Sequence, residues 1–351
     1  MEYRVLGRTG VKVSTHSLGA MALGRQGNPD HDDCIRMVHT ALDAGINLID
    51  TADVYSQGES EVIVGKALRG RRDQVVLATK VHFPAGKGVN EAGNSRLWIM
   101  RALEASLRRL ATDHIDLYQL HRPDEIVDIE ETLGVLGDLV SAGKIRYAGT
   151  STFPAWQLVD ARRIAERDRT TRFACEQPPY SIFVRTAERD LFEVTRRLGM
   201  GVLAWSPLAG GWLTGKYRKD RAIPEDSRAV RAKDWGERIA RRFDMARPAN
   251  RRKLDLVEDL ARIAQDAGMP MAHMAIAFTL AHPAVTSAII GPRTMDHLVD
   301  LLGAADVRLD AGTLDAIDEV VEPGSFIEDA DRGWSEPWMK PEARRRPTLF
   351  S

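Results

Sequence analysis

The sequence predicts an α/β fold, a (β/α)8 TIM barrel that takes up residues 1–351 as one domain, from three observations. Short apolar, β-branched runs recur eight times along the chain, and segments with helical periodicity lie between them. Glycines stand where these helices should stop, at Gly45, Gly70, Gly143 and Gly199. No GxGxxG follows the first strand, and no linker rich in Pro, Gly or Ser divides the chain, which disfavours a Rossmann sheet and a second domain.

The expected strands and helices alternate in chain order. Barrel strands are predicted at residues 11–19, 45–52, 75–81, 116–121, 145–151, 173–177, 201–207 and 287–291. Helical periodicity is clearest at residues 32–45, 60–70, 97–113, 129–144 and 188–199. Eight strands that alternate with helices favour a closed barrel over an open doubly wound sheet.

Two segments are expected to lie outside the regular alternation of strands and helices. Residues 2–15 predict a β-hairpin with Thr9 and Gly10 at its turn, which would precede the first barrel strand and plug one end of the barrel. Residues 217–250 form one long insertion after the seventh strand, rich in arginine and without a clean strand. This insertion is either a solvated excursion or a lid near a phosphate-bearing ligand.

The barrel core is expected to cover about residues 3–320, and the remainder forms a tail. Residues 322–351 contain Trp334, Trp338, several prolines and the run of three arginines at 344–346. This composition predicts an extended tail that lies over the barrel mouth or a neighbouring subunit, with partial disorder as the alternative.

Composition narrows the classes of function. The chain has 49 basic and 50 acidic residues, so no strong field attracts nucleic acid or an acidic membrane. Cys34 and Cys175 are too few for a disulfide framework and fit a reducing cytosol, although one bridge stays possible. The N-terminus lacks a signal-peptide pattern, and no apolar run reaches membrane-spanning length. We therefore expect a cytoplasmic protein without a nucleic-acid or membrane partner, and the oligomeric state stays open.

Four ionisable side chains lie at or just past the ends of three successive predicted strands. Asp50 and Tyr55 follow the second, Lys80 ends the third and His121 ends the fourth. All strand C-termini of a parallel barrel face the same way, so these groups are expected to meet at the barrel mouth. Each alone has an ordinary structural role, such as a cap, a loop aromatic, a snorkelling lysine or a core histidine. Together they suit proton delivery, because an ammonium stabilises phenolate and lowers the pKa of a phenol.

The segments around these residues closely resemble the aldo-keto reductases. The stretch GINLIDTADVYSQGESEVIVGKAL at 45–68 is similar to that family's first signature, and LATK, DLYQLHRPD and AGTSTF follow in the family's order. EQPPYS and WSPLAGGWLTGKY resemble most the subfamily of potassium-channel β subunits and their bacterial relatives. The resemblance covers about residues 3–320, and its motifs are many and ordered.

The resemblance implies an enzyme that transfers a hydride from NADPH to an aldehyde or ketone. By the same resemblance, Tyr55 is the proton donor and Lys80 lowers the pKa of its phenol. Asp50 pairs with Lys80, and His121 orients the substrate carbonyl. The channel β subunits lack the histidine, so His121 favours an ordinary reductase.

A cofactor site is likewise implied by residues that match the family. Ser151, Thr152 and Gln177 would hold the nicotinamide carboxamide, and Trp205 would stack on the nicotinamide ring. The family usually has asparagine where this chain has Thr152. The loop matched to the pyrophosphate consists of Ser206, Pro207, Leu208, Ala209 and Gly210.

Further cofactor contacts are implied near the seventh and eighth strands. Lys216 would supply a cation to a phosphate, while Gly291 and Arg293 match the region that reads the adenosine 2′-phosphate. A guanidinium there favours NADPH over NADH. His297 belongs to the same region, where the family commonly has glutamine. The residues that follow depart as well, since Asp300 and Leu301 stand for glutamate and asparagine, and this keeps NADH possible.

Three rival interpretations were weighed. Residues 210–216, GGWLTGK, match the GxxxxGK of a P-loop, but the next residue is Tyr217 and the magnesium-binding hydroxyl is missing. A non-catalytic nucleotide-binding subunit with a redox-sensing or regulatory role is the main alternative, and the intact set of four argues against it. A metal-dependent hydrolase is disfavoured, since the nine histidines include no HxH or HExxH, and no metal is expected.

The sequence thus predicts an NADPH-dependent carbonyl reductase with a small-molecule aldehyde or ketone as substrate. Loop position alone places Met21, Tyr55, His82 and Phe83 in the pocket wall. The particular substrate cannot be read, because substrate loops vary most among barrels.

Overall fold

The computed structural model describes residues 1–345 and shows a closed barrel of parallel strands in the order β10-β3-β4-β5-β6-β7-β8-β9. The predicted (β/α)8 TIM barrel is therefore confirmed. The barrel strands are β3 (His16–Gly19), β4 (Leu48–Asp50), β5 (Val76–Val81), β6 (Ile115–Leu120), β7 (Ile145–Ser151), β8 (Phe173–Gln177), β9 (Gly201–Trp205) and β10 (Ser287–Ile290). Each lies within, or within one residue of, an apolar run that predicted it.

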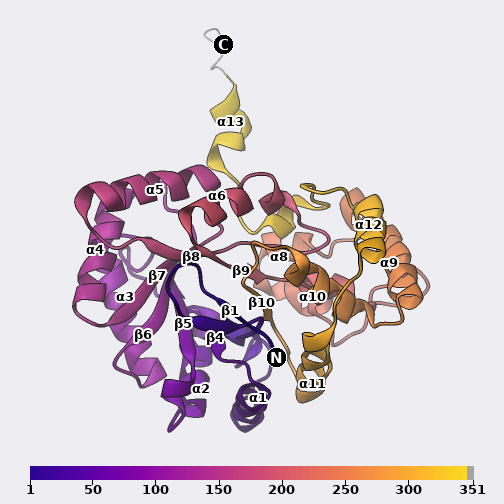
Figure 1. Ribbon diagram of the computed structural model, residues 1–351, viewed down its shortest axis with the longest axis horizontal. Helices are drawn as coiled ribbons and strands as arrows, with labels where there is room; N and C mark the ends of the chain where they lie inside the picture. The colour runs from indigo at the N-terminus through magenta and orange to yellow at the C-terminus, as the bar shows by residue number, and fades with distance from the viewer. Residues whose placement is uncertain (346–351) are drawn as a thin grey trace.

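Helices surround the barrel and cover the outer faces of the strands (Figure 1). The longer ones are α1 (His31–Asp43), α2 (Glu59–Ala67), α3 (Arg96–Leu110), α4 (Ile129–Ser141), α5 (Ala155–Asp168), α6 (Leu191–Leu198), α9 (Pro248–Asp266), α10 (Met271–Ala281), α11 (Met295–Leu302) and α12 (Ala311–Val320). The expected stop glycines follow four of them, and Gly199 ends α6 in the left-handed region with φ 69°. None of the described helices is long and apolar enough to cross a membrane.

The first predicted run, residues 11–19, contains two strands. β2 (Lys12–Ser14) pairs with β1 (Tyr3–Val5) in an antiparallel hairpin, and β3 begins after Thr15. Leu6 and Val13 of the hairpin segment pack against barrel-interior side chains such as Leu48. The hairpin therefore plugs one end of the barrel, as predicted, and it crosses the strands in Figure 1.

The segment after β9 packs onto the barrel, which agrees with only one of the two forms expected for it, the lid. Residues 217–247, which we call the strap, include the short helices α7 (Arg228–Arg231) and α8 (Glu237–Arg241). Tyr217, Ala229 and Phe243 are buried in the core, because the strap packs its apolar side chains onto the barrel. The interpretation as a solvated excursion is therefore wrong.

The strap lies across the barrel mouth. The Arg293 guanidinium beyond β10 pairs with Asp226 of the strap at 2.6 Å. Further along, Arg228 reaches the sulfur of Met21, just after β3, at 3.9 Å. These contacts hold the strap in the position that a lid requires.

The tail is anchored to the strap and to α9 by a buried carboxylate. Asp331 is buried and pairs with Arg242 of the strap at 2.6 Å and with Lys253 of α9 at 2.5 Å. Two residues later, Gly333 lies against Trp205 so closely that a Cβ there would stand 2.5 Å from the indole ring. The expectation that the tail covers the mouth therefore holds for this part of it.

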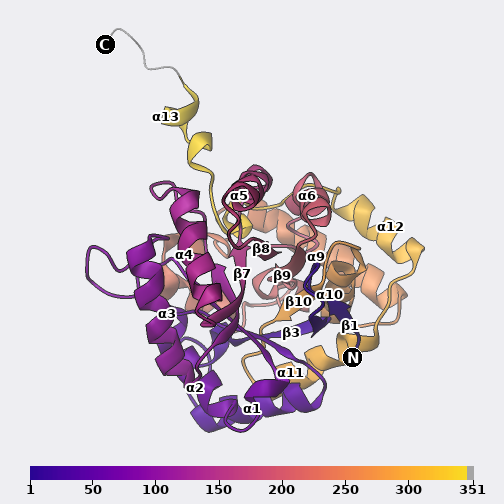
Figure 2. The ribbon, with the colours of Figure 1, turned by 60° about the vertical axis from the view of Figure 1, so that its left-hand side comes forward.

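Beyond this anchor the tail leaves the barrel. Trp338 packs between Trp334 and Trp156 of α5, with ring centroids 5.6 and 5.9 Å apart. α13 (Pro341–Arg344) then extends away from the body in both ribbon views (Figures 1 and 2). The predicted tail also includes residues 346–351, with Arg346, which lie outside the described residues.

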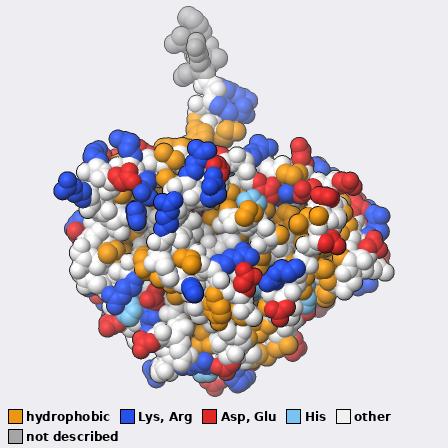
Figure 3. Space-filling model, in the orientation of Figure 1, with side chains coloured by type: hydrophobic (Ala, Val, Ile, Leu, Met, Phe, Trp, Pro, Cys, Tyr) orange, Lys and Arg blue, Asp and Glu red, His pale blue; other side chains and the backbone are white. Residues whose placement is uncertain are grey.

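Basic and acidic side chains are interspersed over the face seen in Figure 3.

Candidate active site

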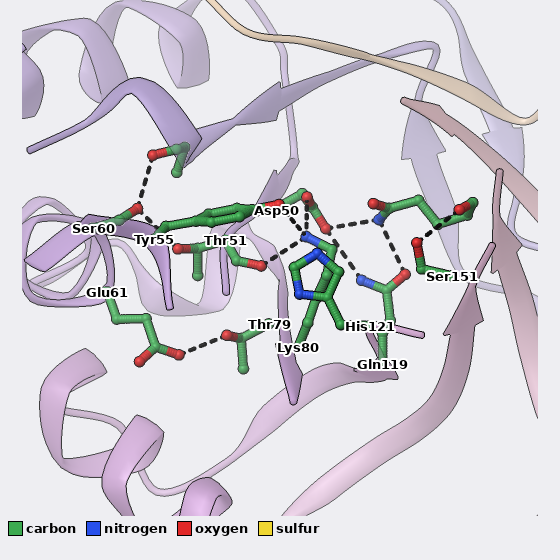
Figure 4. A network of polar contacts seen from close by, with 12 residues as sticks. Asp50, Thr51, Tyr55, Ser60, Glu61, Thr79, Lys80, Gln119, His121 and Ser151 are labelled. Carbon is green, nitrogen blue, oxygen red and sulfur yellow. Dashed lines mark hydrogen bonds and ion pairs between the residues drawn. The ribbon is translucent and has the colours of Figure 1, made fainter. Parts of the chain in front are cut away.

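The four predicted residues converge inside the barrel mouth (Figure 4). Asp50 and Lys80 point inward because alternate residues of a strand face the same side. Tyr55 follows β4, and His121 directly follows β6. The Lys80 ammonium lies 2.5 Å from the Asp50 carboxylate and 3.3 Å from the Tyr55 phenol oxygen. The Tyr55 and His121 rings meet edge to face with centroids 5.8 Å apart.

The centre of this cluster is a fully buried lysine. Burial alone would lower the pKa of Lys80, but the charges of Asp50 and Tyr55, and hydrogen bonds to both, raise it above the ordinary value. A third hydrogen bond runs to the Thr51 carbonyl oxygen at 2.9 Å. Every donor of the ammonium thus has a partner, so the group is fixed in place and charged.

The Asp50 carboxylate is held by two amides on its other oxygen. Gln119 and Gln177 donate to Asp50 Oδ1 at 3.1 and 2.9 Å, and Gln177 also donates to the Gln119 carbonyl at 3.1 Å. The family resemblance implies a cofactor contact for Gln177 and points to no role for Gln119. The signal was present, because Gln119 precedes His121 by two residues and therefore shares its face of the strand.

His121 is almost completely buried beside the cluster. Burial lowers the pKa of its imidazole well below the usual range, and Lys80 and Arg122 lower it further. The ring is therefore neutral near pH 7, and its Nδ1 has no hydrogen-bond partner among the described residues. A neutral imidazole can donate one hydrogen bond to an oxygen in the mouth.

The backbone after Tyr55 is strained. Ser56 and Gln57 both have positive φ, 49° and 59°, which is uncommon for residues other than glycine. The Ser56 amide donates to the Gln26 side chain at 3.1 Å, and the Gln26 amide donates back to the Ser56 hydroxyl at 3.2 Å. This pair holds the turn that presents the phenol.

The expected nicotinamide contacts lie at adjacent strand ends. Ser151 donates to the Gln177 backbone carbonyl at 2.9 Å, and Thr152 takes a positive φ of 61°. Beneath this turn, Glu176 is buried and accepts from the Thr150 hydroxyl at 2.5 Å and the Phe153 amide at 3.2 Å. Burial raises the pKa of Glu176 to about 7, although these hydrogen bonds lower it.

The expected ring and pyrophosphate contacts continue around the mouth. Trp205 ends β9, and its indole Nε1 is buried without a hydrogen-bond partner among the described residues. The loop from Ser206 to Gly210 follows directly and has positive φ at Ser206, Ala209 and Gly210. The Gly210 amide donates to the Ser206 hydroxyl at 3.0 Å, so this loop is tightly turned.

Cations gather where the strap meets β10. Lys216 and Arg293 were expected there, and the strap adds Arg228 and Arg231, which the sequence analysis missed. Burial lowers the pKa of Lys216, and these three guanidinium groups add to the effect. Buried Nε atoms of Arg228 and Arg231 have no hydrogen-bond partner among the described residues. Only the abundance of arginine in the insertion pointed to them.

The departures from the family pattern have structural explanations. Leu301 is buried in the core, and Asp300 contacts the His273 ring at 3.3 Å. These side chains therefore belong to the packing of α11 onto α10. His297 is exposed. Desolvation lowers the pKa of its imidazole, and the charges of Lys216 and Arg293 lower it further. Gly291 has open space where a side chain would be.

The predicted pocket wall is partly reproduced. Phe83 packs edge to face on His121 with centroids 4.8 Å apart. His82 is held by the Asn94 side chain at 3.0 Å, and Met21 contacts the strap. Of the predicted wall residues, Phe83 and Tyr55 are the two whose rings pack on His121.

Comparison with known proteins agrees with this fold. The sequence model of the aldo/keto reductase family matches residues 17–322, so the chain belongs to the aldo/keto reductase family. It is 40% identical to YrpG, an uncharacterised oxidoreductase of Bacillus subtilis, over 91% of this chain and 96% of that protein.

Two further relatives carry a different description. The chain is 35% identical to a putative voltage-gated potassium channel subunit beta of Schizosaccharomyces pombe, over 91% of this chain and 93% of that protein. A probable voltage-gated potassium channel subunit beta of Arabidopsis thaliana is also 35% identical, over 92% and 97%. The subfamily named from the sequence is thereby confirmed, and family membership supports an oxidoreductase.

Proposed function

We propose that this protein is an NADPH-dependent reductase that converts an aldehyde or ketone into an alcohol. The observation that carries the proposal is the buried Lys80 ammonium, which lies between the Asp50 carboxylate and the Tyr55 phenol. Such a group stabilises the phenolate that remains once the phenol has given up its proton. Tyr55 is therefore the proton donor to the carbonyl oxygen.

The remaining residues position the substrate and maintain the charge. Neutral His121 donates a hydrogen bond to the carbonyl oxygen and polarises it. Asp50 keeps Lys80 protonated in a buried site, and Gln119 fixes the orientation of Asp50. When bound, the nicotinamide supplies the hydride that reaches the carbonyl carbon.

The residues present fit a dinucleotide phosphate. Buried guanidinium nitrogens without partners are costly, and phosphate oxygens would satisfy those of Arg228 and Arg231. Lys216 and Arg293 add charge nearby, and His297 and Gly291 leave room beside them. NADPH carries a 2′-phosphate that NADH lacks, so NADPH accounts better for these cations. NADH can still bind, with lower affinity.

Turnover by a phenol-less variant tests the proposal. NADPH oxidation is followed against a panel of neutral aldehydes and ketones with the wild type, Tyr55→Phe and the control Tyr3→Phe, which loses a hairpin hydroxyl. We expect Tyr55→Phe to lose about a thousandfold or more in kcat, since general-acid catalysis is removed. Wild-type turnover by Tyr55→Phe would exclude this mechanism.

Cofactor preference has a separate test. Arg293→Ala should weaken NADPH binding about tenfold or more and leave NADH binding nearly unchanged, since only NADPH carries the 2′-phosphate. Fluorescence titration with both nucleotides measures the two affinities. Equal losses would remove Arg293 from the 2′-phosphate site.

A second candidate function follows from the channel-subunit relatives. In this case the protein binds the nucleotide as a redox-sensing or regulatory subunit and turns over poorly. His121 favours the enzyme, because a sensor does not need a carbonyl-orienting group. Nucleotide binding at full affinity, with no turnover on any carbonyl of the panel, would favour the sensor.

We also propose a cytoplasmic location and a small-molecule substrate, with no nucleic-acid or membrane partner. Basic and acidic residues are nearly balanced, so no single-sign field attracts a polyanion. Fractionation of cells that express the protein would test the location.

A further inference from the structure

Two guanidinium groups at the barrel mouth have no role in the proposed reaction. Arg122 follows His121 directly, and Arg238 lies on α8 of the strap. Neither forms an ion pair with any side chain that the structure describes. Both lie apart from the cations that surround Lys216 and Arg293, which the cofactor phosphates account for.

Arg122 faces the place where a substrate would lie. Its guanidinium carbon stands 5.4 Å from the centre of the Phe83 ring and 6.0 Å from that of Trp205. One Nη donates to the His121 backbone carbonyl, which fixes the side chain over the mouth. Burial is the main cause that lowers the pKa of Arg122 to about 10, and the charge of Arg238 contributes. One Arg122 Nη lies beside Gly333 of the tail, 3.6 Å from where a Cβ there would stand. The turn just before it, Asp329–Arg332, contacts α8, which carries Arg238.

Arg238 has unsatisfied hydrogen-bonding groups. Its Nε and one Nη are buried and have no hydrogen-bond partner among the described residues. Asp329 and Glu336 lie in the same region, but both already pair with Arg332. An unpaired buried donor is unfavourable, and more so when it is charged, so a natural ligand should satisfy it.

We propose that Arg122 and Arg238 form a subsite for a carboxylate carried by the carbonyl substrate itself. Both guanidinium groups lie against the same stretch of the tail and keep donors without a partner among the described residues. A carboxylate, which accepts bidentate hydrogen bonds, is the group that such donors suit. This proposal rests on the proposed reductase function and names the class of its substrate.

The position of Phe83 limits the length of such a substrate. Its ring packs on His121 at 4.8 Å and on Arg122 at 5.4 Å, so one aromatic ring separates the carbonyl-orienting group from the anion-binding group. The substrate is therefore a short oxo acid, in which a few carbon atoms join an aldehyde or ketone to the carboxylate. Its apolar chain would lie on the face of Phe83.

The test compares an acid with its neutral ester. Reduction of succinic semialdehyde and of its methyl ester is measured for the wild type, Arg122→Gln, Arg122→Lys and Arg238→Gln. We expect the wild type to prefer the acid in kcat/KM about tenfold or more, because a charge-assisted pair is lost with the ester. Arg122→Gln should abolish this preference through KM, and Arg122→Lys should restore part of it. Arg238→Gln should reduce the preference.

Controls separate this proposal from the reductase function. Arg163→Gln on the exposed side of α5 makes the same change in net charge and should leave the preference intact. Equal reduction of acid and ester by the wild type would overturn the subsite and leave the reductase standing. A stronger preference for glyceraldehyde phosphate over glyceraldehyde than for the acid over its ester would overturn the assignment to a carboxylate.

Binding gives a readout that needs no turnover. Succinate, which has no aldehyde or ketone group to reduce, should bind to the wild type and quench the fluorescence of Trp205. Arg122→Gln should bind succinate about tenfold more weakly. If no carbonyl is reduced but this difference is found, the subsite holds and the reductase function fails. If succinate binds both proteins equally, the subsite is wrong.

Discussion

The two sides of the barrel mouth are built on opposite principles. On the side of β4 to β6, Lys80, Asp50 and Gln119 satisfy one another with short hydrogen bonds. On the side of β9, β10 and the strap, Arg228 and Arg231 carry buried donors that have no partner in the part of the chain that the structure describes. One side is complete within the protein, and the other leaves charge to be neutralised by a ligand.

This difference shows what each side is built to do. A proton donor must be positioned before the substrate arrives, so its hydrogen bonds are made within the fold. A binding surface for anions gains affinity from groups that remain unpaired until the ligand binds. A cluster whose hydrogen bonds are all made within the fold thus indicates a catalytic site. Cations that stay unpaired until a ligand arrives indicate a binding site for an anion.

The largest effect is expected from a substitution on the side of β4 to β6, where the hydrogen bonds are made within the protein. Lys80→Met leaves the Asp50 carboxylate buried without its cation, which should cost about 3–5 kcal/mol of the free energy of unfolding. Turnover should fall about a thousandfold or more, since the phenolate is no longer stabilised. Urea unfolding and NADPH oxidation measure the two effects. The exposed Lys66→Met is the control, and similar stability of both variants would contradict the buried pair.

Asp53 is the exception on this side, because both its carboxylate oxygens are buried and neither meets a side-chain partner among the described residues. Burial, with a further contribution from Glu61, raises the pKa of Asp53 from 3.8 to about 8. The folded state therefore holds this proton more tightly than the unfolded state. Its contribution to stability is complete below about pH 4 and is lost as the pH rises through about 8.

Asp53→Asn should flatten this dependence. Between about pH 5 and 8 the wild type should lose stability by about 1.4 kcal/mol per pH unit from this group, and the variant should not. Glu176, with a pKa of about 7, contributes in the same direction and persists in both proteins. Thermal unfolding of both proteins across this range measures the difference. Parallel pH curves would show that Asp53 ionises normally.

A substitution on the side of β9, β10 and the strap should weaken ligand binding without a loss of stability. Burial, with Arg242 and Arg231, lowers the pKa of Arg228 to about 10, so its charge is unfavourable without a ligand. Arg228→Gln should leave the free protein as stable as the wild type, or more so, while NADPH binding weakens about tenfold. Melting with and without NADPH tests both halves. A loss of stability without nucleotide would place Arg228 among structural residues.

The smallest expected effect concerns the tail that touches both sides. Gly333 has φ 81°, and a Cβ there would clash with the Trp205 ring at 2.5 Å. Gly333→Ala should cost about 1–2 kcal/mol and shift the tryptophan emission, because strain and displacement act together. Gly312→Ala, in the open, is the control. An unshifted spectrum would mean that the tail does not restrain Trp205.

Most of the fold could be predicted because the barrel strands are short apolar runs separated by helical periodicity. The errors came where packing depends on distant partners. Residues 11–19 read as one strand although Thr15 separates two, and Tyr217 gave no sign that it is buried. A local pattern cannot show which surface a loop will cover.

The candidate site could be predicted in part for a similar reason. Asp50, Lys80 and His121 are marked by their positions at strand ends, so their meeting at the mouth follows from the barrel. Arg122 and Arg228 carry no signal in the sequence, because only the three-dimensional structure shows that neither forms an ion pair with a side chain that the structure describes.

The hairpin of β1 and β2 has a kinetic consequence. Its Leu6 and Val13 help to fill the barrel interior with packed side chains, so every ligand must enter and leave at the mouth. A nucleotide held at Ser151 and Gln177, beneath a substrate at Arg122, would be loaded first and released last. Product-inhibition patterns should therefore show a compulsory order of binding rather than a random one.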